Sequence, residues 1–367
     1  RMMRPEAEAE LAEDIAGVTG PLFIQGGGTR GCAVEGEILS TRGLSGVELY
    51  EPGALTMVAQ AGTSVAEIET LLAEQGQRLA FEPMDHRGLL EVAGEPSIGG
   101  VFAANISGPR RIQCGAARDF LLGVRFVDGT GQVVKNGGRV MKNVTGYDLV
   151  KLMAGAHGTL GVLSEVSFKV LPKPEAEATV VVADVDLGAA VQVMSAALGS
   201  PFDVTGAAYD PAKRSAYVRV EGFAGSVDYR SDKLVADLAR FGSSVRAEES
   251  AELWRGIRDI DVFHGKSGDV WRISVKPSDA LALREQIGAN ELLFDWGGGL
   301  VWALVPEGVN LRAKMKVPGH ASLVRASAET RARLGQFQPD PAPLAAISAG
   351  LRAKFDPRGI LNAGLMG

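Results

Sequence analysis

Glycine clusters at four places in the first half of the chain suggest chemistry by their residue type and spacing. The clusters begin at Gly26, Pro96, Thr145 and His157, and apolar stretches typical of strands border each of them. Because glycine has no Cβ, backbone N–H groups in such segments can approach a ligand closely. One such loop is common and can be a tight turn without a ligand. Four of them favour one long anionic ligand held by backbone amides, and a dinucleotide with its pyrophosphate fits best.

The first cluster, residues 26–31, has the spacing G-x-G-x-x-G at Gly26, Gly28 and Gly31. A Rossmann fingerprint also requires an amphipathic helix directly after the loop, so that the helix N-terminus meets the pyrophosphate. Residues 32–37 contain another glycine and no helical stripe of apolar residues. The pattern therefore favours a nest of backbone amides around a diphosphate over a nicotinamide cofactor on a Rossmann fold.

The second cluster is the longest, because small residues dominate residues 96–108. Such a segment can follow a flat ring with its backbone in contact, although close helix packing through glycine and alanine is an alternative. Ser97 could donate to a phosphate and Arg111 could neutralise one. The neighbouring Arg118 and Asp119 are as consistent with a structural ion pair as with a functional one.

The composition excludes several classes of function. The chain has 367 residues, a net charge of −6 and only 6% aromatic residues, which gives no indication of nucleic-acid binding. Its two cysteines cannot form a zinc cluster, and their scarcity is typical of a reducing compartment. No apolar signal-peptide core or membrane span is present, so we expect a cytoplasmic protein that contacts a membrane only through partners.

The periodicity predicts a mixed α+β fold with a first boundary at the prolines near residue 175. Helices are expected at 6–18 and 65–75, and a hairpin at 121–135. The order strand–helix–strand–strand–helix then occurs twice, which predicts a split βαβ arrangement with one antiparallel sheet. A helix near Leu253, Trp254 and Ile257 is a candidate for an exposed apolar patch that contacts a partner.

Taken in order, these segments resemble the FAD-binding fold of the p-cresol methylhydroxylase and vanillyl-alcohol oxidase type. Within it, the chain is most similar to the smaller flavin subunit of bacterial glycolate oxidase. The similarity covers residues 20–175, including 142–149 and 158–163, and returns at 355–362. The resemblance implies a two-lobed FAD-binding domain (1–175), an α+β cap domain with an antiparallel sheet (176–334) and a C-terminal segment that returns to the FAD-binding domain (335–367).

The resemblance also implies which residues hold FAD. The first loop would cradle the pyrophosphate, and the second cluster would line the ribityl chain and the diphosphate. Gly115 and Asp119 would sit near the flavin, the fourth cluster would meet the adenine side, and the tail would approach the isoalloxazine. The implied cofactor-binding residues are Gly26, Gly27, Gly28, Thr29, Arg30, Pro96, Ser97, Ile98, Gly99, Gly100, Asn105, Ser107, Gly108, Arg111, Gly115, Asp119, Gly158, Gly161, Val162 and Asn362. Several relatives attach FAD covalently through a histidine in the first loop. Because this loop has no histidine, we expect non-covalent FAD.

One motif of the related D-2-hydroxy-acid dehydrogenases is missing. These enzymes carry a His-x-Gly-Asp-Gly-Asn segment in the cap, whose histidine helps to bind a divalent metal. None of the four histidines of this chain, His86, His157, His264 and His320, lies in such a segment. We therefore expect no metal site and assign no catalytic residue.

The resemblance implies an FAD-dependent oxidoreductase that works as a subunit of a glycolate oxidase or dehydrogenase complex. A sister flavin subunit with a metal-binding cap would oxidise glycolate to glyoxylate, and an iron–sulfur subunit would carry the electrons onward. The complex would be cytoplasmic or peripheral at the inner membrane. Two alternatives are a flavin-free structural assembly subunit and a stand-alone 2-hydroxy-acid dehydrogenase.

Overall fold

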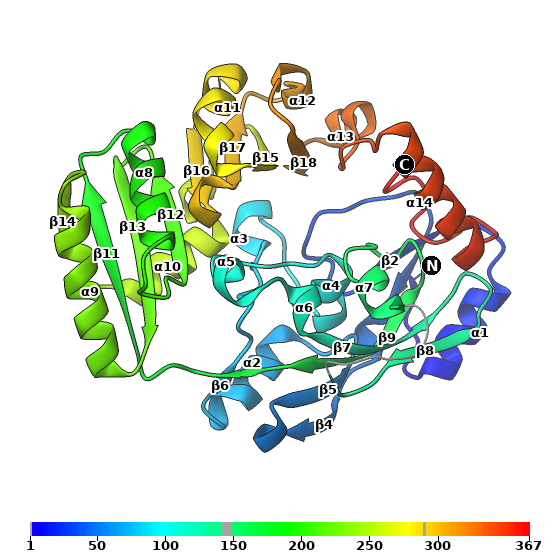
Figure 1. Ribbon diagram of the computed structural model, residues 1–367. Coiled ribbons are helices and arrows are strands. Elements are labelled where there is room, and N and C mark those ends of the chain that lie inside the picture. Colours follow the sequence, from blue (N-terminus) through cyan, green and yellow to red (C-terminus); the bar gives the residue numbers. More distant parts are fainter. Residues whose placement is uncertain (1, 141–147, 289–290) are drawn as a thin grey trace.

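The computed structural model describes residues 2–140, 148–288 and 291–367 (Figure 1). Its N-terminal part contains a three-stranded parallel sheet, a five-stranded antiparallel sheet and a short two-stranded pair. The parallel sheet has the order β1 (Met2–Met3), β3 (Glu37–Ser40), β2 (Leu22–Gln25). The antiparallel sheet has the order β4 (Val47–Glu51), β5 (Thr56–Gln60), β9 (Val162–Lys169), β7 (Leu121–Val127), β8 (Val133–Gly137), and the pair is β10 (Leu171–Pro172) with β6 (Gln77–Arg78).

Short helices surround these sheets. They are α1 (Glu8–Gly17), α2 (Val65–Glu74), α3 (Arg87–Leu90), α4 (Ile98–Ala103), α5 (Arg111–Cys114), α6 (Ala117–Phe120) and α7 (Leu149–Met153). The side chain of Ser64 accepts a hydrogen bond from the Glu67 N–H and so caps α2, whose buried Ile68 and Leu72 join the core under the antiparallel sheet. Residues 32–36 form no helix after the first glycine loop, and the chain instead continues into β3 parallel to β2. This local structure differs from a Rossmann unit.

The middle of the chain forms one eight-stranded antiparallel sheet, as the sequence predicts. Its strand order is β14 (Ser243–Arg246), β11 (Ala176–Ala183), β13 (Ser215–Gly222), β12 (Gly206–Asp210), β16 (Glu291–Asp295), β17 (Leu300–Val305), β15 (Asp269–Val275), β18 (Gly319–Arg325). Its helices, and those that follow it, are α8 (Leu187–Leu198), α9 (Ala224–Leu238), α10 (Ser250–Asp259), α11 (Ala280–Ile287), α12 (Leu311–Lys314), α13 (Ala328–Leu334) and α14 (Ala342–Phe355).

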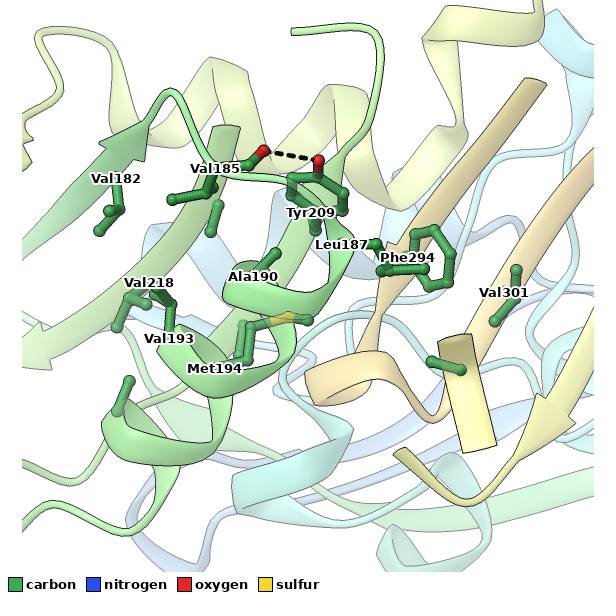
Figure 2. Close-up of a cluster of buried hydrophobic side chains, with 14 of the residues drawn as sticks. Val182, Val185, Leu187, Ala190, Val193, Met194, Tyr209, Val218, Phe294 and Val301 are labelled. Atoms are coloured by element: carbon green, nitrogen blue, oxygen red, sulfur yellow. Dashed lines mark hydrogen bonds between the residues drawn. The ribbon is translucent and has the colours of Figure 1, made fainter. Parts of the chain in front are cut away.

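The two halves of this sheet meet at β12 and β16, which share one paired position, Tyr209 with Phe294. The two rings lie 6.1 Å apart, and the Tyr209 hydroxyl donates to the Val185 carbonyl at 2.8 Å. Figure 2 shows both rings beside the buried face of α8, which contributes Leu187, Ala190, Val193 and Met194 to the same core. The joint is therefore an apolar contact more than a hydrogen-bonded one.

Helices α8, α9 and α11 cover one face of the sheet, and α10 packs on the opposite face. The predicted apolar patch on α10 is wrong, because Trp254 is only 2% exposed and Ile257 only 8% exposed. Both pack against Ala208 and Tyr217, and the Trp254 indole N–H donates to Thr179 Oγ1 at 2.8 Å. The sequence pattern did show one apolar face on this helix, but that face covers the sheet.

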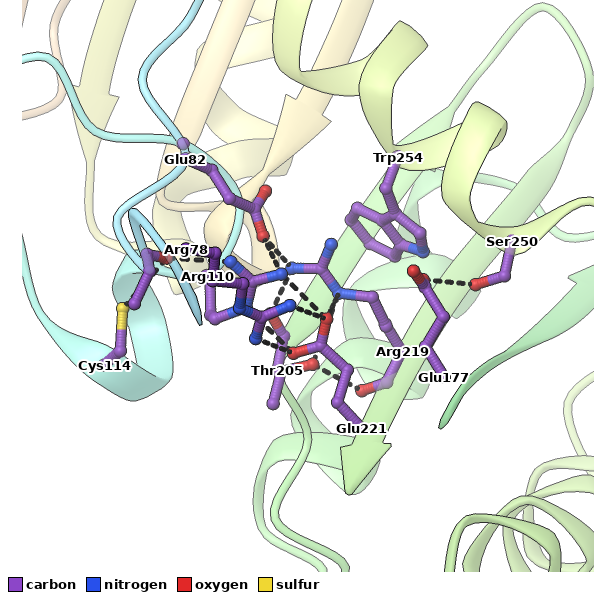
Figure 3. Close-up of polar contacts among 12 residues, drawn as sticks. Arg78, Glu82, Arg110, Cys114, Glu177, Thr205, Arg219, Glu221, Ser250 and Trp254 are labelled. Carbon is purple, nitrogen blue, oxygen red and sulfur yellow. Dashed lines mark hydrogen bonds and ion pairs between the residues drawn. The ribbon is translucent and has the colours of Figure 1, made fainter. Parts of the chain in front are cut away.

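Ion pairs and apolar contacts join the sheet to the N-terminal part. Met84 and Leu89 pack against Val270 and Leu293 on the α10 side of the sheet. Nearby, Glu221 at the end of β13 pairs with Arg78 and Arg110, as Figure 3 shows. The same cluster contains Glu82 and Arg219, whose guanidinium rests 4.7 Å from the Trp254 ring centroid. The contact is therefore fixed by both charge and packing.

The C-terminal segment lies against the first strands of the chain. Leu361 forms a parallel bridge with Leu22, and the Leu22 N–H donates to the Ile360 carbonyl at 2.7 Å. The Arg358 guanidinium donates to the carbonyls of Val18 and Gly129 at 2.8 and 2.7 Å. These contacts hold the tail beside the end of β2, where the first glycine cluster begins.

Candidate functional site

Segments far apart in the sequence line one pocket. The pocket has about 1000 Å³ of space not filled by protein atoms, part of it open to solvent. Its lining comes from the end of β2, the first glycine cluster, the start of α4, the loop before β9 and the C-terminal tail. Because the sheets bring these segments together, a ligand in the pocket would contact all of them.

The first and second glycine clusters pack directly on each other. A Cβ at Gly26 would overlap the Ser97 side chain, and a Cβ at Gly27 would overlap the Glu95 carbonyl. Ser97 is itself buried and its hydroxyl accepts a hydrogen bond from the Gly100 N–H at 3.2 Å, which caps α4. Only glycine fits at these two positions, because the two backbone segments lie so close together. Since glycine has no side chain, its main-chain groups form this part of the pocket wall.

Arg30 brings a positive charge into this pocket. Its Nε is buried without a hydrogen-bond partner, and no described carboxylate forms an ion pair with the side chain. A Cβ at Gly100 would lie only 2.9 Å from its terminal nitrogens, so the guanidinium lies against the first turn of α4. Burial lowers the pKa of Arg30 from its usual value, as expected for a cation that lacks a counter-charge. An anion in the pocket would supply that counter-charge.

Two histidines near Arg30 are neutral. Burial, and then the charge of Arg30, lower the pKa of His86 and of His157 to about 3. His157 lines the pocket, and its ring lies 4.6 Å from that of Phe337 in the segment before α14. Neutral imidazoles add no positive charge at the pocket, so Arg30 is the residue there that can balance a diphosphate.

Asn362 fixes the C-terminal tail to the pocket wall. Its Oδ1 accepts from the Ile24 N–H at 2.7 Å, and its Nδ2 donates to the His157 carbonyl at 2.8 Å. The residue has φ +44, a left-handed conformation that asparagine tolerates better than most residues. One side chain therefore joins β2, the fourth glycine cluster and the tail, three of the segments that line the pocket.

The structure brings many of the sequence-predicted site residues to the pocket. Those that line it are Gly26, Gly27, Gly28, Thr29, Arg30, Ser97, Gly99, Gly100, Gly158, Gly161, Val162 and Asn362. Eight others lie outside this lining: Pro96, Ile98, Asn105, Ser107, Gly108, Arg111, Gly115 and Asp119. The motif residues 142–147 lie outside the described residues.

Several of the eight make local hydrogen bonds. Asn105 Oδ1 accepts from the Arg118 N–H, and Ser107 Oγ accepts from the Ala117 N–H, both at 2.9 Å. The Asp119 carboxylate accepts from the Ala116 N–H at 2.8 Å and pairs with Lys151 at 3.3 Å. An Arg118–Asp119 ion pair is therefore wrong, because Lys151 provides the cation from α7.

Further lining residues were not predicted from the sequence. They are Phe23, Ile24, Gln25, Gly31, Cys32, Thr41, Ala61, Ala103, Met153, His157, Leu163 and Leu365. Most are apolar or small and give no signal of their own, although several directly adjoin a predicted residue. His157 stands at the start of the fourth cluster, and its position there was the available signal.

The described residues contain neither a cluster of metal ligands nor a membrane-spanning helix. No group of three or more histidine, cysteine, aspartate or glutamate side chains within the described ranges is placed to hold a metal ion. In the same part of the chain, no helix combines the length and the apolar character needed to cross a membrane.

Comparison with known proteins identifies the family. A model described as FAD binding domain matches residues 3–137. Over 352 residues the chain is 35% identical to glycolate oxidase subunit GlcE of Escherichia coli, covering 94% of this chain and 92% of that protein. It is 29% identical over 180 residues to glycolate oxidase subunit GlcD of Bacillus subtilis, covering 48% of this chain and 37% of that protein.

A solved structure shares this fold. The chain superposes on alkyldihydroxyacetonephosphate synthase with a TM-score of 0.70 and 17% identity, covering 99% of this chain and 76% of that one. The predicted fold class, the predicted FAD cofactor and the resemblance stated from the sequence are thus confirmed. The pocket agrees with this cofactor, because it offers glycine backbone and a half-buried guanidinium without an ion-pair partner to a diphosphate. The chain belongs to the family of the glycolate oxidase subunit GlcE, whose fold is that of FAD-binding oxidoreductases.

Proposed function

We propose that the chain binds FAD non-covalently in this pocket and serves as a flavin subunit in the oxidation of a 2-hydroxy acid such as glycolate. The observation that carries the proposal is the convergence of the glycine segments and the unpaired Arg30 on one pocket. When bound, FAD would supply the two-electron acceptor that such an oxidation requires. The names of the GlcE and GlcD relatives support glycolate as the substrate class.

In this proposal the pocket residues divide the cofactor among them. The first glycine cluster would hold the diphosphate through backbone N–H groups, and Arg30 would balance its charge. The loop at Gly158, Gly161 and Val162 would meet the adenine side of FAD, and Asn362 in the C-terminal tail would approach its isoalloxazine ring. Asn105, Ser107 and Gly108 would line the ribityl chain and the diphosphate, and Gly115 and Asp119 would sit near the flavin, all beyond the described pocket lining.

The chain would act inside a complex. Both similar relatives are named as subunits, which supports a multi-subunit assembly. We assign the glycolate chemistry to a sister flavin subunit with a metal-binding cap and the onward electron transfer to an iron–sulfur subunit. Any membrane contact would pass through these partners.

Flavin content tests the core of the proposal. We expect the full chain, purified, to show a flavin absorption spectrum and to hold or take up one FAD per chain. Acid precipitation should release all of the flavin into the supernatant, because the first loop has no histidine for attachment. A colourless protein that cannot be reconstituted would refute the proposal and favour a structural assembly subunit. Flavin that stays in the precipitate would refute the non-covalent mode.

Reduction by glycolate separates a subunit from a stand-alone dehydrogenase. We expect glycolate to bleach the flavin of the isolated chain much more slowly than that of the chain mixed with its sister subunit. Equal rates in the two samples would show that the isolated chain is self-sufficient and would contradict the subunit role.

A further inference from the structure

Two arginines that do not line the FAD pocket rest on one tryptophan ring. The guanidinium carbon of Arg111 lies 4.6 Å from the centroid of the Trp296 ring, and that of Arg272 lies 5.1 Å from it. Arg111 is the first residue of α5, Arg272 lies in β15 and Trp296 directly follows β16. The three side chains meet where the eight-stranded sheet faces the N-terminal part, and each keeps part of its surface exposed.

The tryptophan is held in place from both sides. Its indole N–H donates to the Gly108 carbonyl at 3.0 Å, and its backbone N–H donates to the buried Asp295 carboxylate at 2.7 Å. Its φ is +50, in the left-handed region that a bulky side chain rarely occupies. Backbone strain of this kind persists where the surroundings fix it, and it concentrates at functional sites. The ring is thus a fixed platform that spans both parts of the molecule.

The two guanidinium groups make no direct ion pair, although the charge of Asp119 acts on Arg111 and that of Asp295 acts on Arg272. Across the described ranges, neither side chain forms a hydrogen bond or an ion pair, and the remaining positions of the sequence contain no aspartate or glutamate. By contrast, Arg110 and Arg219 nearby each pair with glutamate. Burial, and then the neighbouring charge of Arg111, lower the pKa of Arg272 to about 10, while the charge of Asp295 opposes this shift. Burial also raises the pKa of Asp295 to about 7, so this acid is a weak source of negative charge.

We infer that Arg111 and Arg272 together bind the carboxylate of a small organic acid, with Trp296 as the platform that orients both guanidinium groups. The inference rests on the proposed function and adds to it that this chain has a carboxylate site of its own for a 2-hydroxy or 2-oxo acid, besides the site of glycolate oxidation in the sister subunit. Guanidinium groups donate paired hydrogen bonds that match a carboxylate, and the ring face stabilises both cations. A phosphate of FAD could also satisfy two arginines, and the experiment separates this source.

The test uses the full chain loaded with FAD and two probes, glycolate and the non-oxidisable dicarboxylate oxalate. Binding is followed by the visible difference spectrum of the flavin and by titration calorimetry. We expect Arg111→Gln and Arg272→Gln each to weaken oxalate binding by at least about tenfold, with unchanged FAD content. The control Arg255→Gln removes an arginine from the exposed side of α10 and should bind as the wild type. Glycolamide, which has no carboxylate, should not bind.

Each other outcome has a defined meaning. If oxalate does not bind to the wild type, or binds to both variants as tightly as to the wild type, the inference is wrong while FAD binding still supports the proposed function. If the variants lose FAD and keep oxalate, the arginines serve the cofactor and the inference is also wrong. If the chain takes up no FAD, the proposed function fails, and calorimetry on the FAD-free chain still decides the inference. Should Arg272→Gln not fold, Arg272→Lys replaces it, since lysine keeps the charge but not the paired donors and should weaken binding severalfold.

Discussion

Arg30 carries a positive charge into the pocket where no described acidic side chain balances it. A half-buried cation without an ion-pair partner destabilises the empty protein, so its presence is explained if a bound anion completes the site. The glycine at position 100 leaves the space that its terminal nitrogens occupy. Charge and space at this position thus agree with a diphosphate ligand.

Replacing Arg30 should therefore separate cofactor affinity from stability. We expect Arg30→Gln to weaken FAD binding by about tenfold to a hundredfold, because one charge-assisted contact to phosphate is lost. The FAD-free protein should be as stable as the wild type or more stable, since an unpaired charge is removed. Quenching of flavin fluorescence gives the affinity, and thermal unfolding without FAD gives the stability. The exposed Arg42 supplies the control variant Arg42→Gln, and equal FAD affinity in both variants would contradict this role of Arg30.

His86 makes the stability depend on pH. Its pKa is lowered to about 3 in the folded chain by burial and then by Arg30, against 6.5 for an ordinary histidine. Between these values the unfolded chain binds the extra proton, so stability is complete above pH 6.5 and falls as the pH decreases toward 3. From pH 7 to pH 5 this one group should remove about 2 kcal/mol.

The variant His86→Gln should accordingly lose less stability than the wild type over this range. Urea unfolding at pH 7 and pH 5 measures the difference, and the exposed His320 gives the matched control His320→Gln. If the two histidine variants and the wild type lose the same stability, His86 is not held neutral by the fold.

The sequence identified site residues best where one segment carries its own signal. The first glycine cluster and Arg30 stand next to each other, and twelve predicted residues do line the pocket. Arg272 and Trp296 were not predicted as partners of Arg111, because only the docked sheet brings these distant positions together. Phe337, which packs on His157, was missed for the same reason.

At the scale of elements, local capping and turn signals predicted well. The capping pattern at Ser64 marks the start of α2, and the predicted hairpin is β7 and β8. The edge strand β18 was missed, since its role depends on pairing with β15. The face of α10 was misassigned because an amphipathic helix looks alike whether it covers its own sheet or binds a partner.

A change of charge at Glu221, at the end of β13, should have a large effect on the stability of the folded chain. Burial alone would raise the pKa of Glu221, but the hydrogen bond from Arg110 and the charges of Arg219 and Arg78 lower it. We expect Glu221→Gln to reduce the free energy of unfolding by about 3 kcal/mol, because the buried Arg110 and Arg219 and the half-buried Arg78 lose their shared partner.

Urea unfolding at neutral pH measures this effect. The exposed pair of Asp228 with Arg246 gives the control Asp228→Asn, which should cost less than about 1 kcal/mol. A loss for Glu221→Gln as small as that of the control would show that the ion cluster in Figure 3 adds nothing to the contact between β13 and residues 78–110.

At the scale of the whole molecule, the FAD pocket and the arginine pair on Trp296 depend on different contacts. The pocket is built within the N-terminal part and the tail, so the eight-stranded sheet contributes no residue to its lining. The arginine pair exists only where the sheet docks on that part, through Met84, Leu89 and the ion cluster. A change in the sheet should therefore affect carboxylate binding before it affects FAD binding.

Phe294 allows this separation to be tested. Its ring is fully buried at the joint between the two halves of the sheet, and Trp296 lies two residues further along the chain. We expect Phe294→Ala to reduce the free energy of unfolding by about 3–5 kcal/mol through the cavity it leaves (Figure 2). Oxalate binding should weaken in the folded variant because the Trp296 platform shifts, whereas FAD affinity should remain that of the wild type. Phe223→Ala is the matched control, since that ring is 79% exposed and its loss should cost little. If both variants unfold alike, the two halves are not joined through Phe294; if Phe294→Ala loses FAD and oxalate together, the two sites are not independent.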